Sequence, residues 1–328
     1  MRQLFPRFES IKQRIYPRFK LRLFMKLRGI KTLTKACRIL RTNPEVAKNL
    51  GFCSLPTYET IRHFANDLLT DEVLKKIFYA EVKEIDNELN GDLGKVTIED
   101  ATVITAKAKD PEAEYNAYYD DRGWKKDLVI DQRYGVFLSF SDIGINDNEA
   151  DCLVGHLEEL EKIGIRVGEN IVDGKYPTYE NIATAKHEYR TNLIYTPQEH
   201  WVHNPKGEPE EIERMYQKYW QEEDFSPEAS IGYKLRFLFD RGEYEAVGAY
   251  YRNKVMEDGQ DEDYSHRVQI ESSNGYLKSQ VGFEDLPRKG ARPAFRHTTL
   301  CLIAVDAVAL TRLRHGVKED LTSVAYLT

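Results

Sequence analysis

The feature that most constrains the fold is a change of hydrophobic pattern near residue 95. Before it, apolar residues recur at helical spacing, and after it β-branched runs predict three strands and then helix, strand, helix and strand. The expected strands are 96–104, 128–130, 136–140, 171–172 and 192–195, and the expected helices are 148–164 and 178–189. Strands that alternate with helices favour an α/β fold.

The segment before this change is strongly basic at its start. Residues 1–50 carry fourteen lysine and arginine side chains against two glutamates, a net charge of +12, while the remainder carries 33 basic and 52 acidic side chains, a net charge of −19. Aromatic side chains interleave with these cations, which suits contact with a phosphate backbone. The alternative is a basic surface helix without a partner, or one that pairs with the acidic remainder. We favour DNA contact, because such charge asymmetry is typical of nucleic-acid binding.

Short helical patterns follow at 33–40 and 61–68, and a longer one runs from about 71 to 89. Asn43-Pro44 separates the first two, and Asn90-Gly91 is typical of a helix stop. Short helices with tight turns and many cations are compatible with a helix-turn-helix-like DNA-binding region, although any small helical bundle has the same pattern.

The bulk properties favour a water-soluble protein. Mean hydropathy is −0.58, 31% of residues are charged, and no apolar run approaches the roughly 18 residues of a membrane helix. We expect no membrane partner, no signal peptide and a cytoplasmic location. The four cysteines are far apart and form no C-x-x-C pair, so we expect neither a zinc site nor disulfides.

Four side chains in the last third of the chain fall on one strip of a helix. Tyr264, Arg267, Glu271 and Lys278 stand at offsets that place them within about 60° around a helix axis. A carboxylate flanked by cations, with a phenol at one end, suits metal-assisted chemistry on a phosphodiester. The alternative is an ordinary solvated helix face, which often combines Arg, Glu and Lys.

Two aspartates stand in or after predicted strands. Asp100 lies inside the apolar strand 96–104, where an unpaired charge is costly, and its neighbour Glu99 points to the opposite face. Asp173 follows the strand 171–172, so it is either a ligand at the carboxyl end of a strand or a turn residue. Their separation of 73 residues fits two strands of one sheet.

The motif Tyr-x2-Arg-x3-Glu-x6-Lys, present as YSHRVQIESSNGYLK, resembles the signature of the DDE (Asp-Asp-Glu) transposases of bacterial and archaeal insertion sequences. The segment IEDATVI resembles the first catalytic motif of that family, and Asp-Gly-Lys-Tyr after strand 171–172 resembles the second. The resemblance implies a metal-binding catalytic set and a DNA-contacting set. These are Asp100, Asp173 and Glu271 for two Mg²⁺ or Mn²⁺ ions, and Tyr264, Arg267 and Lys278 for DNA.

The resemblance also implies a fold and an organisation. By analogy, the order of predicted elements is that of a ribonuclease-H-like catalytic core, with a mainly helical N-terminal region and an insertion before the last catalytic helix. The implied regions are 1–92 for DNA binding, 93–198 for the first part of the core, 199–262 for the insertion and 263–328 for the C-terminal catalytic helices.

We therefore expect a transposase that cleaves double-stranded DNA at terminal inverted repeats and joins it to target DNA. The resemblance implies a homodimer on DNA and a nucleoid-associated location in a prokaryotic cell. One alternative is a ribonuclease-H-like nuclease that cuts without joining. Another is a non-catalytic DNA-binding protein derived from a transposase, which the intact acidic triad argues against.

Overall fold

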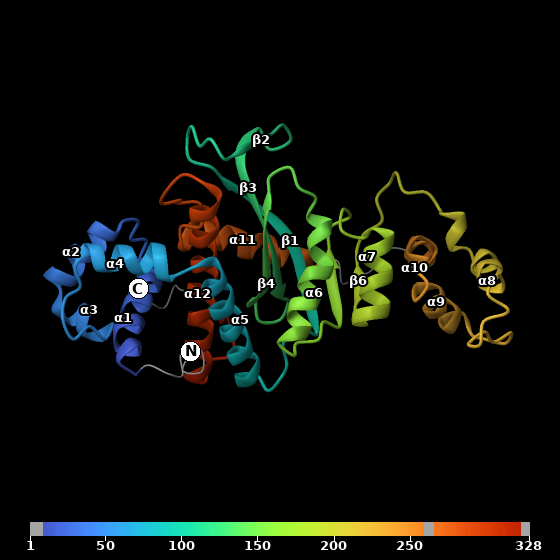
Figure 1. Ribbon diagram of the computed structural model, residues 1–328, viewed down its shortest axis with the longest axis horizontal. Coiled ribbons are helices and arrows are strands. Elements are labelled where there is room, and N and C mark those ends of the chain that lie inside the picture. The colour runs from blue at the N-terminus through green and yellow to red at the C-terminus, as the bar shows by residue number, and fades with distance from the viewer. Residues whose placement is uncertain (1–8, 259–265, 323–328) are drawn as a thin grey trace.

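The computed structural model describes residues 9–258 and 266–322 (Figure 1). A sheet lies in the middle of the molecule, with one group of helices at each end, so the chain is a mixed α/β protein as the sequence predicts (Figure 1). The helices at one end are α1 (Glu9–Leu27), α2 (Leu33–Thr42), α3 (Pro44–Asn49) and α4 (Tyr58–His63). Those at the other end are α8 (Pro209–Gln217), α9 (Ile231–Phe239) and α10 (Tyr244–Asp258).

The sheet is built around strand β1. This strand pairs antiparallel with β3 and parallel with β5, and β5 pairs parallel with β6. On the far side of β3, both β2 and β4 pair with it antiparallel. The strands are β1 (Val96–Thr105), β2 (Glu114–Asn116), β3 (Asp121–Asp131), β4 (Phe137–Gly144), β5 (Glu169–Val172) and β6 (Asn192–Ile194).

Helices cover both faces of this sheet. On β3, Lys126 donates a hydrogen bond to Thr299 of α12, while the next residue, Asp127, lies against His156 of α6. Successive side chains of a strand point to opposite faces, so α12 and α6 lie on opposite faces. The first face carries α11 (Val268–Gln280) and α12 (Ala291–Arg314), and the second carries the 3₁₀-helix η2 (Glu149–Cys152), α6 (Leu153–Lys162), α7 (Tyr179–Thr184) and the π-helix η3 (Ala185–Tyr189). Helix α5 (Asp71–Glu88) packs against α12 and is also joined to α6 by the ion pair of Lys75 with Glu159.

Polar caps mark the starts of the N-terminal helices. Thr32, Asn43, Thr57 and Thr70 each accept a hydrogen bond from the backbone N–H three residues later, at the starts of α2, α3, α4 and α5. Each cap satisfies a donor that the helix itself leaves unpaired and is worth about 1 kcal/mol. A π-helix, η1 (Phe64–Leu68), continues α4.

Helix α1 is an element that the sequence analysis did not assign. It contains Pro17 and packs against α12. Burial lowers the pKa of Arg22 to about 10 and that of Lys26 to about 8, and Lys26 is hydrogen-bonded to His297 of α12. Part of the basic segment is therefore packed into the protein. Exposed cations in the same segment are Lys20, Arg28, Lys31, Lys35, Arg38, Arg41 and Lys48.

The segment between β6 and α11 contains the 3₁₀-helix η4 (Pro205–Gly207) and helices α8 to α10 around an apolar cluster of their own. Helix α10 joins this cluster to the sheet region because it packs closely on α7. At Gly248, a Cβ atom would lie 2.0 Å from the carbonyl oxygen of Tyr179, so a glycine permits the close approach of the two helices.

Helix α12 is long and apolar enough to cross a membrane by length and composition, but 72% of its most apolar window is buried inside the protein. That burial is typical of the core helix of a water-soluble protein. Asp306 of this helix is fully buried and accepts a hydrogen bond of 3.2 Å from the backbone N–H of Phe137, and burial raises its pKa well above the ordinary value.

Candidate active site

Two of the predicted catalytic residues meet at one arginine. The parallel register of β1 and β5 ends with Glu99 opposite Val172, and Asp100 and Asp173 are the next residues along the two strands. Arg267 Nη2 lies 3.5 Å from Asp100 Oδ1 and 3.7 Å from Asp173 Oδ2. Residues that are far apart in the sequence therefore form one small charged group at the end of β5.

This group carries more negative than positive charge. Burial raises the pKa of Asp100 to about 6, a rise that Arg267 opposes and that the charges of Asp127 and Asp173 increase. The side chains of Asp100 and Asp173 remain 20% and 34% exposed, so solvent and ions reach them. Carboxylate oxygens are the ligands that Mg²⁺ prefers, and a cation would relieve the repulsion between the two aspartates.

Helix α11 carries the remaining predicted residues. Arg267 is its N-cap, and Glu271 lies exposed in its first turn, on nearly the same side of the helix. In the described part of the chain, no hydrogen bond or ion pair joins Glu271 to either aspartate. Lys278 lies about 10 Å farther along the helix than Glu271 and forms an ion pair of 2.9 Å with Glu284. Tyr264 lies outside the described residues.

The opposite face of β1 carries a buried polar cluster. Glu99 is fully buried and accepts a hydrogen bond of 2.7 Å from Asn170 of β5. Beside it on β3, Asp127 accepts a hydrogen bond of 2.7 Å from the hydroxyl of Tyr176, and its other carboxylate oxygen lies 3.5 Å from His156 Nε2. Burial and the charge of Asp127 raise the pKa of Glu99 well above its ordinary value.

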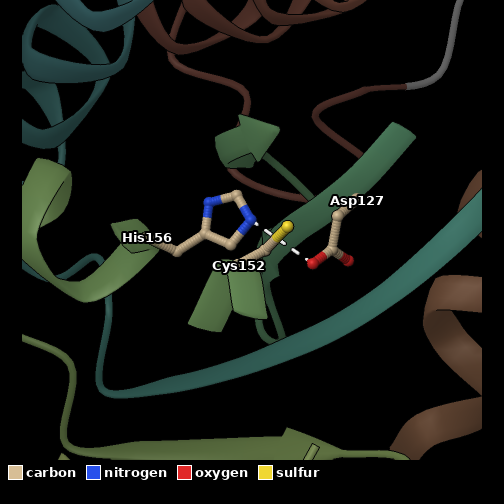
Figure 2. Close-up of side chains that lie close together, drawn as sticks. All are labelled: Asp127, Cys152 and His156. Carbon is tan, nitrogen blue, oxygen red and sulfur yellow. Dashed lines mark ion pairs between the residues drawn. The ribbon is translucent and has the colours of Figure 1, made fainter. Parts of the chain in front are cut away.

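A third ligand-type side chain completes this cluster. Ligand atoms of Asp127, Cys152 and His156 all lie within 4.8 Å of one another, and Figure 2 shows the three side chains converging from β3 and from the start of α6. Such a group could hold a metal ion. The sequence analysis missed it. The only local signal was the C-x3-H spacing of Cys152 and His156, which lies on one helical face but is not specific for a metal site.

A basic cavity lies between the N-terminal helices and α12. Its volume is about 480 Å³, and its lining includes Arg22, Lys31, Arg288, Arg292 and Arg296. The last two of these form ion pairs with Asp71 at the start of α5, and Lys31 forms an ion pair with Asp285. The remaining positive charge suits an anionic group such as a phosphate.

No family model and no curated protein matches the sequence. Among solved structures, the chain is similar to a piggyBac transposase synaptic complex with hairpin DNA, with 10% identity and a TM-score of 0.34 over 94% of this chain and 73% of that chain. It is also similar to a Drosophila P element transposase strand transfer complex, with 12% identity and a TM-score of 0.27 over 89% of this chain and 82% of that chain.

Proposed function

We propose that the protein is a metal-dependent DNA transposase that cleaves transposon ends and joins them to target DNA. The observation that carries the proposal is the meeting of Asp100 and Asp173 at Arg267. Ligands of open α/β sheets gather at the carboxyl ends of strands. The partly exposed carboxylates at this position offer oxygen ligands to Mg²⁺ or Mn²⁺.

The sheet supports a ribonuclease-H-like core as part of this proposal. Strands β4, β3 and β1 are antiparallel neighbours, and β5 and β6 continue the sheet parallel to β1. Asp100 lies on β1, Asp173 follows the neighbouring parallel strand β5, and Glu271 lies on the later helix α11. We divide the chain into a DNA-binding region (1–92), the first part of the core (93–198), an insertion (199–262) and the C-terminal catalytic helices (263–328).

In this proposal, Asp100, Asp173 and Glu271 would hold the divalent cations. When bound, two such ions activate an attacking water or 3′-hydroxyl and stabilise the leaving 3′-oxygen. Arg267 lies between the two aspartates, where its guanidinium would be available to phosphate oxygens through two parallel hydrogen bonds. Glu271 lies on the helix that Arg267 anchors to both aspartates.

Double-stranded DNA is the proposed partner, both as terminal inverted repeats and as target. Lys278 and Tyr264 contact the DNA beside the catalytic group, and the exposed cations of α2 and the basic cavity bind phosphates farther away. Transposon ends come in pairs, so the active species is a homodimer on DNA. A nucleoid-associated location in a prokaryotic cell belongs to the same proposal.

The test is a cleavage and joining assay on DNA that flanks the coding region, with Mg²⁺ or Mn²⁺. We expect cleavage and a covalently joined target product from the native chain. Asp100→Asn, Asp173→Asn and Glu271→Gln should each abolish both products and leave DNA binding intact. Asp240→Asn is the matched control, because this exposed aspartate lies at the end of α9, in the separate cluster of helices α8 to α10, and its loss should leave both products.

The products also separate the alternatives. Cleavage without a joined product would identify a nuclease that cuts but does not join. Binding without cleavage would identify a non-catalytic DNA-binding protein. Undiminished cleavage by all three carboxylate variants would refute the assignment of the site.

A further inference from the structure

We propose that Asp127, Cys152 and His156 form a second metal site, which holds one Zn²⁺ ion inside the protein on the face of the sheet opposite Asp100. The site stabilises the packing of α6 on β3. The proposal is independent of the strand chemistry proposed above, because none of its three ligands belongs to the Asp100 group.

Two polar atoms are aimed at the centre of this site without hydrogen-bond partners in the described part of the chain. They are Asp127 Oδ2 and His156 Nε2, and these two residues are only 0% and 1% exposed. Their separation of 3.5 Å is typical of two ligands of one tetrahedral Zn²⁺ ion, whose bonds of about 2.0–2.3 Å set ligand atoms roughly 3.3–3.8 Å apart. Cys152 Sγ lies within 4.8 Å of both, so it needs to approach by only about 1 Å.

The outer atoms of the same side chains are already held. Tyr176 donates a hydrogen bond of 2.7 Å to Asp127 Oδ1, and Ser139 Oγ lies 2.7 Å from His156 Nδ1. Tyr79 is hydrogen-bonded to Ser139 at 2.9 Å. These bonds fix the carboxylate and the imidazole so that Asp127 Oδ2 and His156 Nε2 face each other 3.5 Å apart. Metal sites in proteins use such outer hydrogen bonds to orient their ligands.

The charge of the site favours a divalent cation. A carboxylate, a thiolate and a neutral imidazole together carry a charge of −2, which one Zn²⁺ ion cancels. Without a cation, the negative charge of Asp127 lies buried beside a second fully buried acid, Glu99. The donors also select the metal, because thiolate and imidazole suit Zn²⁺ and not Mg²⁺.

The competing explanation is a metal-free network, in which protons alone balance the acidic side chains and His156 pairs with Asp127. Both explanations predict a buried, hydrogen-bonded cluster. They differ in metal content and in the state of the sulfur, which is a metal-bound thiolate in one and a thiol in the other.

The experiment uses the full chain, purified without metal-binding tags and dialysed against a weak chelator. Elemental analysis should find about one zinc per chain. Exchange of zinc for Co²⁺ should produce the thiolate-to-metal charge-transfer band of a cysteine-bound cobalt ion. Cys152→Ser should abolish the band. Cys37→Ser is the matched control, because it removes another buried thiol outside the cluster and should leave the band unchanged.

Two further variants make the test specific. Ser139→Ala removes an outer hydrogen bond only and should weaken zinc binding by about 10- to 100-fold without abolishing the cobalt band. The double variant Asp100→Asn with Asp173→Asn should keep both the zinc and the band, so a failure of the proposed active site does not affect this result. Folded native chain that retains no zinc, or that binds Co²⁺ without a thiolate band, would overturn the proposal.

Discussion

Strand β1 carries two acidic side chains in succession, and they lie in opposite environments. Glu99 is fully buried on the face covered by α6, whereas Asp100 keeps 20% of its side chain exposed on the other face, beside Asp173 and Arg267. The pKa of each carboxyl is raised mainly by burial, but of the two only Asp100 forms an ion pair with a cation among the described residues, namely with Arg267. One strand therefore separates an open charged group from a closed polar cluster.

The two faces of β1 permit different chemistry, because one is open to solvent and the other is closed. A phosphodiester needs solvent-accessible ligands and an arginine or lysine near them, and only the Asp100 face has both. The closed cluster has polar atoms that no substrate reaches, so its chemistry is confined to holding a small ion or a proton. Exposure and not residue type distinguishes the two roles, since both faces are rich in carboxylates.

The largest expected effect comes from comparing the two neighbours directly. Asp100→Asn should reduce metal-dependent DNA cleavage by about 10³-fold or more, because it removes a ligand of the reacting metal ions. Glu99→Gln should leave cleavage within about 10-fold of the native rate, because burial raises the pKa of Glu99 well above its ordinary value and the uncharged glutamine keeps the acceptor for Asn170. Single-turnover cleavage with Mg²⁺ measures both rates.

Equal losses in the two variants would break the distinction between the faces. Circular dichroism and unfolding curves of both proteins are the controls, because a folding defect in Glu99→Gln would mimic a catalytic loss.

Substitutions should also change the free energy of unfolding, and the change should be larger in the closed cluster than in the open group. His156→Ala should lower the free energy of unfolding by about 2–4 kcal/mol, because it removes a fully buried ring, its hydrogen bond with Ser139 and its contact with Asp127. Asp173→Asn should change it by less than about 1 kcal/mol, because its carboxylate is a partly exposed ion-pair partner. Urea unfolding in the presence of a strong chelator measures both without any contribution from bound metal.

A larger destabilisation by Asp173→Asn than by His156→Ala would reverse the comparison. It would mean that the open group is the more important of the two for folding.

The sequence predicted the open face better than the closed one. Asp100 and Asp173 could be expected together because adjacent parallel strands end at the same edge of a sheet, and each stands beside a recognisable apolar run. Local signals also placed the helix stop at Asn90, whose φ is +58°, and the cap Asn148, which accepts a hydrogen bond from Ala150. Each of these signals lies within a few residues of the feature that it predicts.

The closed cluster could not be predicted because its residues come from three elements and lack a specific spacing. Only tertiary packing brings Asp127 of β3 to Cys152 and His156. For the same reason, the net charge of residues 1–50 could not reveal that Arg22 and Lys26 face α12 and not solvent. The DNA contact of Tyr264 and the metal binding of Glu271 stay predictions.

Helix α12 covers part of the Asp100 face, and it carries a fully buried acid, Asp306. Burial raises the pKa of Asp306 well above its ordinary value. Between the unfolded pKa of about 3.9 and the higher folded pKa, the native state binds more protons than the unfolded state, so the free energy of unfolding falls as pH rises. Asp306→Asn removes this titration and keeps an acceptor for Phe137 N–H. Between pH 5 and pH 8, the free energy of unfolding of this variant should therefore rise by about 1–3 kcal/mol relative to that of the native chain.

Urea unfolding of both proteins across this pH range makes the measurement, with Asp151→Asn as the control for an exposed aspartate. Parallel pH profiles for Asp306→Asn and the native chain would mean that Asp306 is ionised in the fold. The covered part of this face would then be as open to solvent as the region around Asp100.

The smallest effect concerns how far the open face extends along α11. Lys278 lies about 10 Å beyond Glu271 and is paired with Glu284. If it contacts a phosphate, Lys278→Gln should weaken DNA binding by only about 2- to 5-fold and reduce the salt dependence by about one counterion. Glu284→Gln should instead strengthen DNA binding, because it releases Lys278 from its ion pair. Fluorescence anisotropy at several salt concentrations measures both. An unchanged slope in both variants would confine the DNA-facing surface to the first turn of α11, next to Arg267.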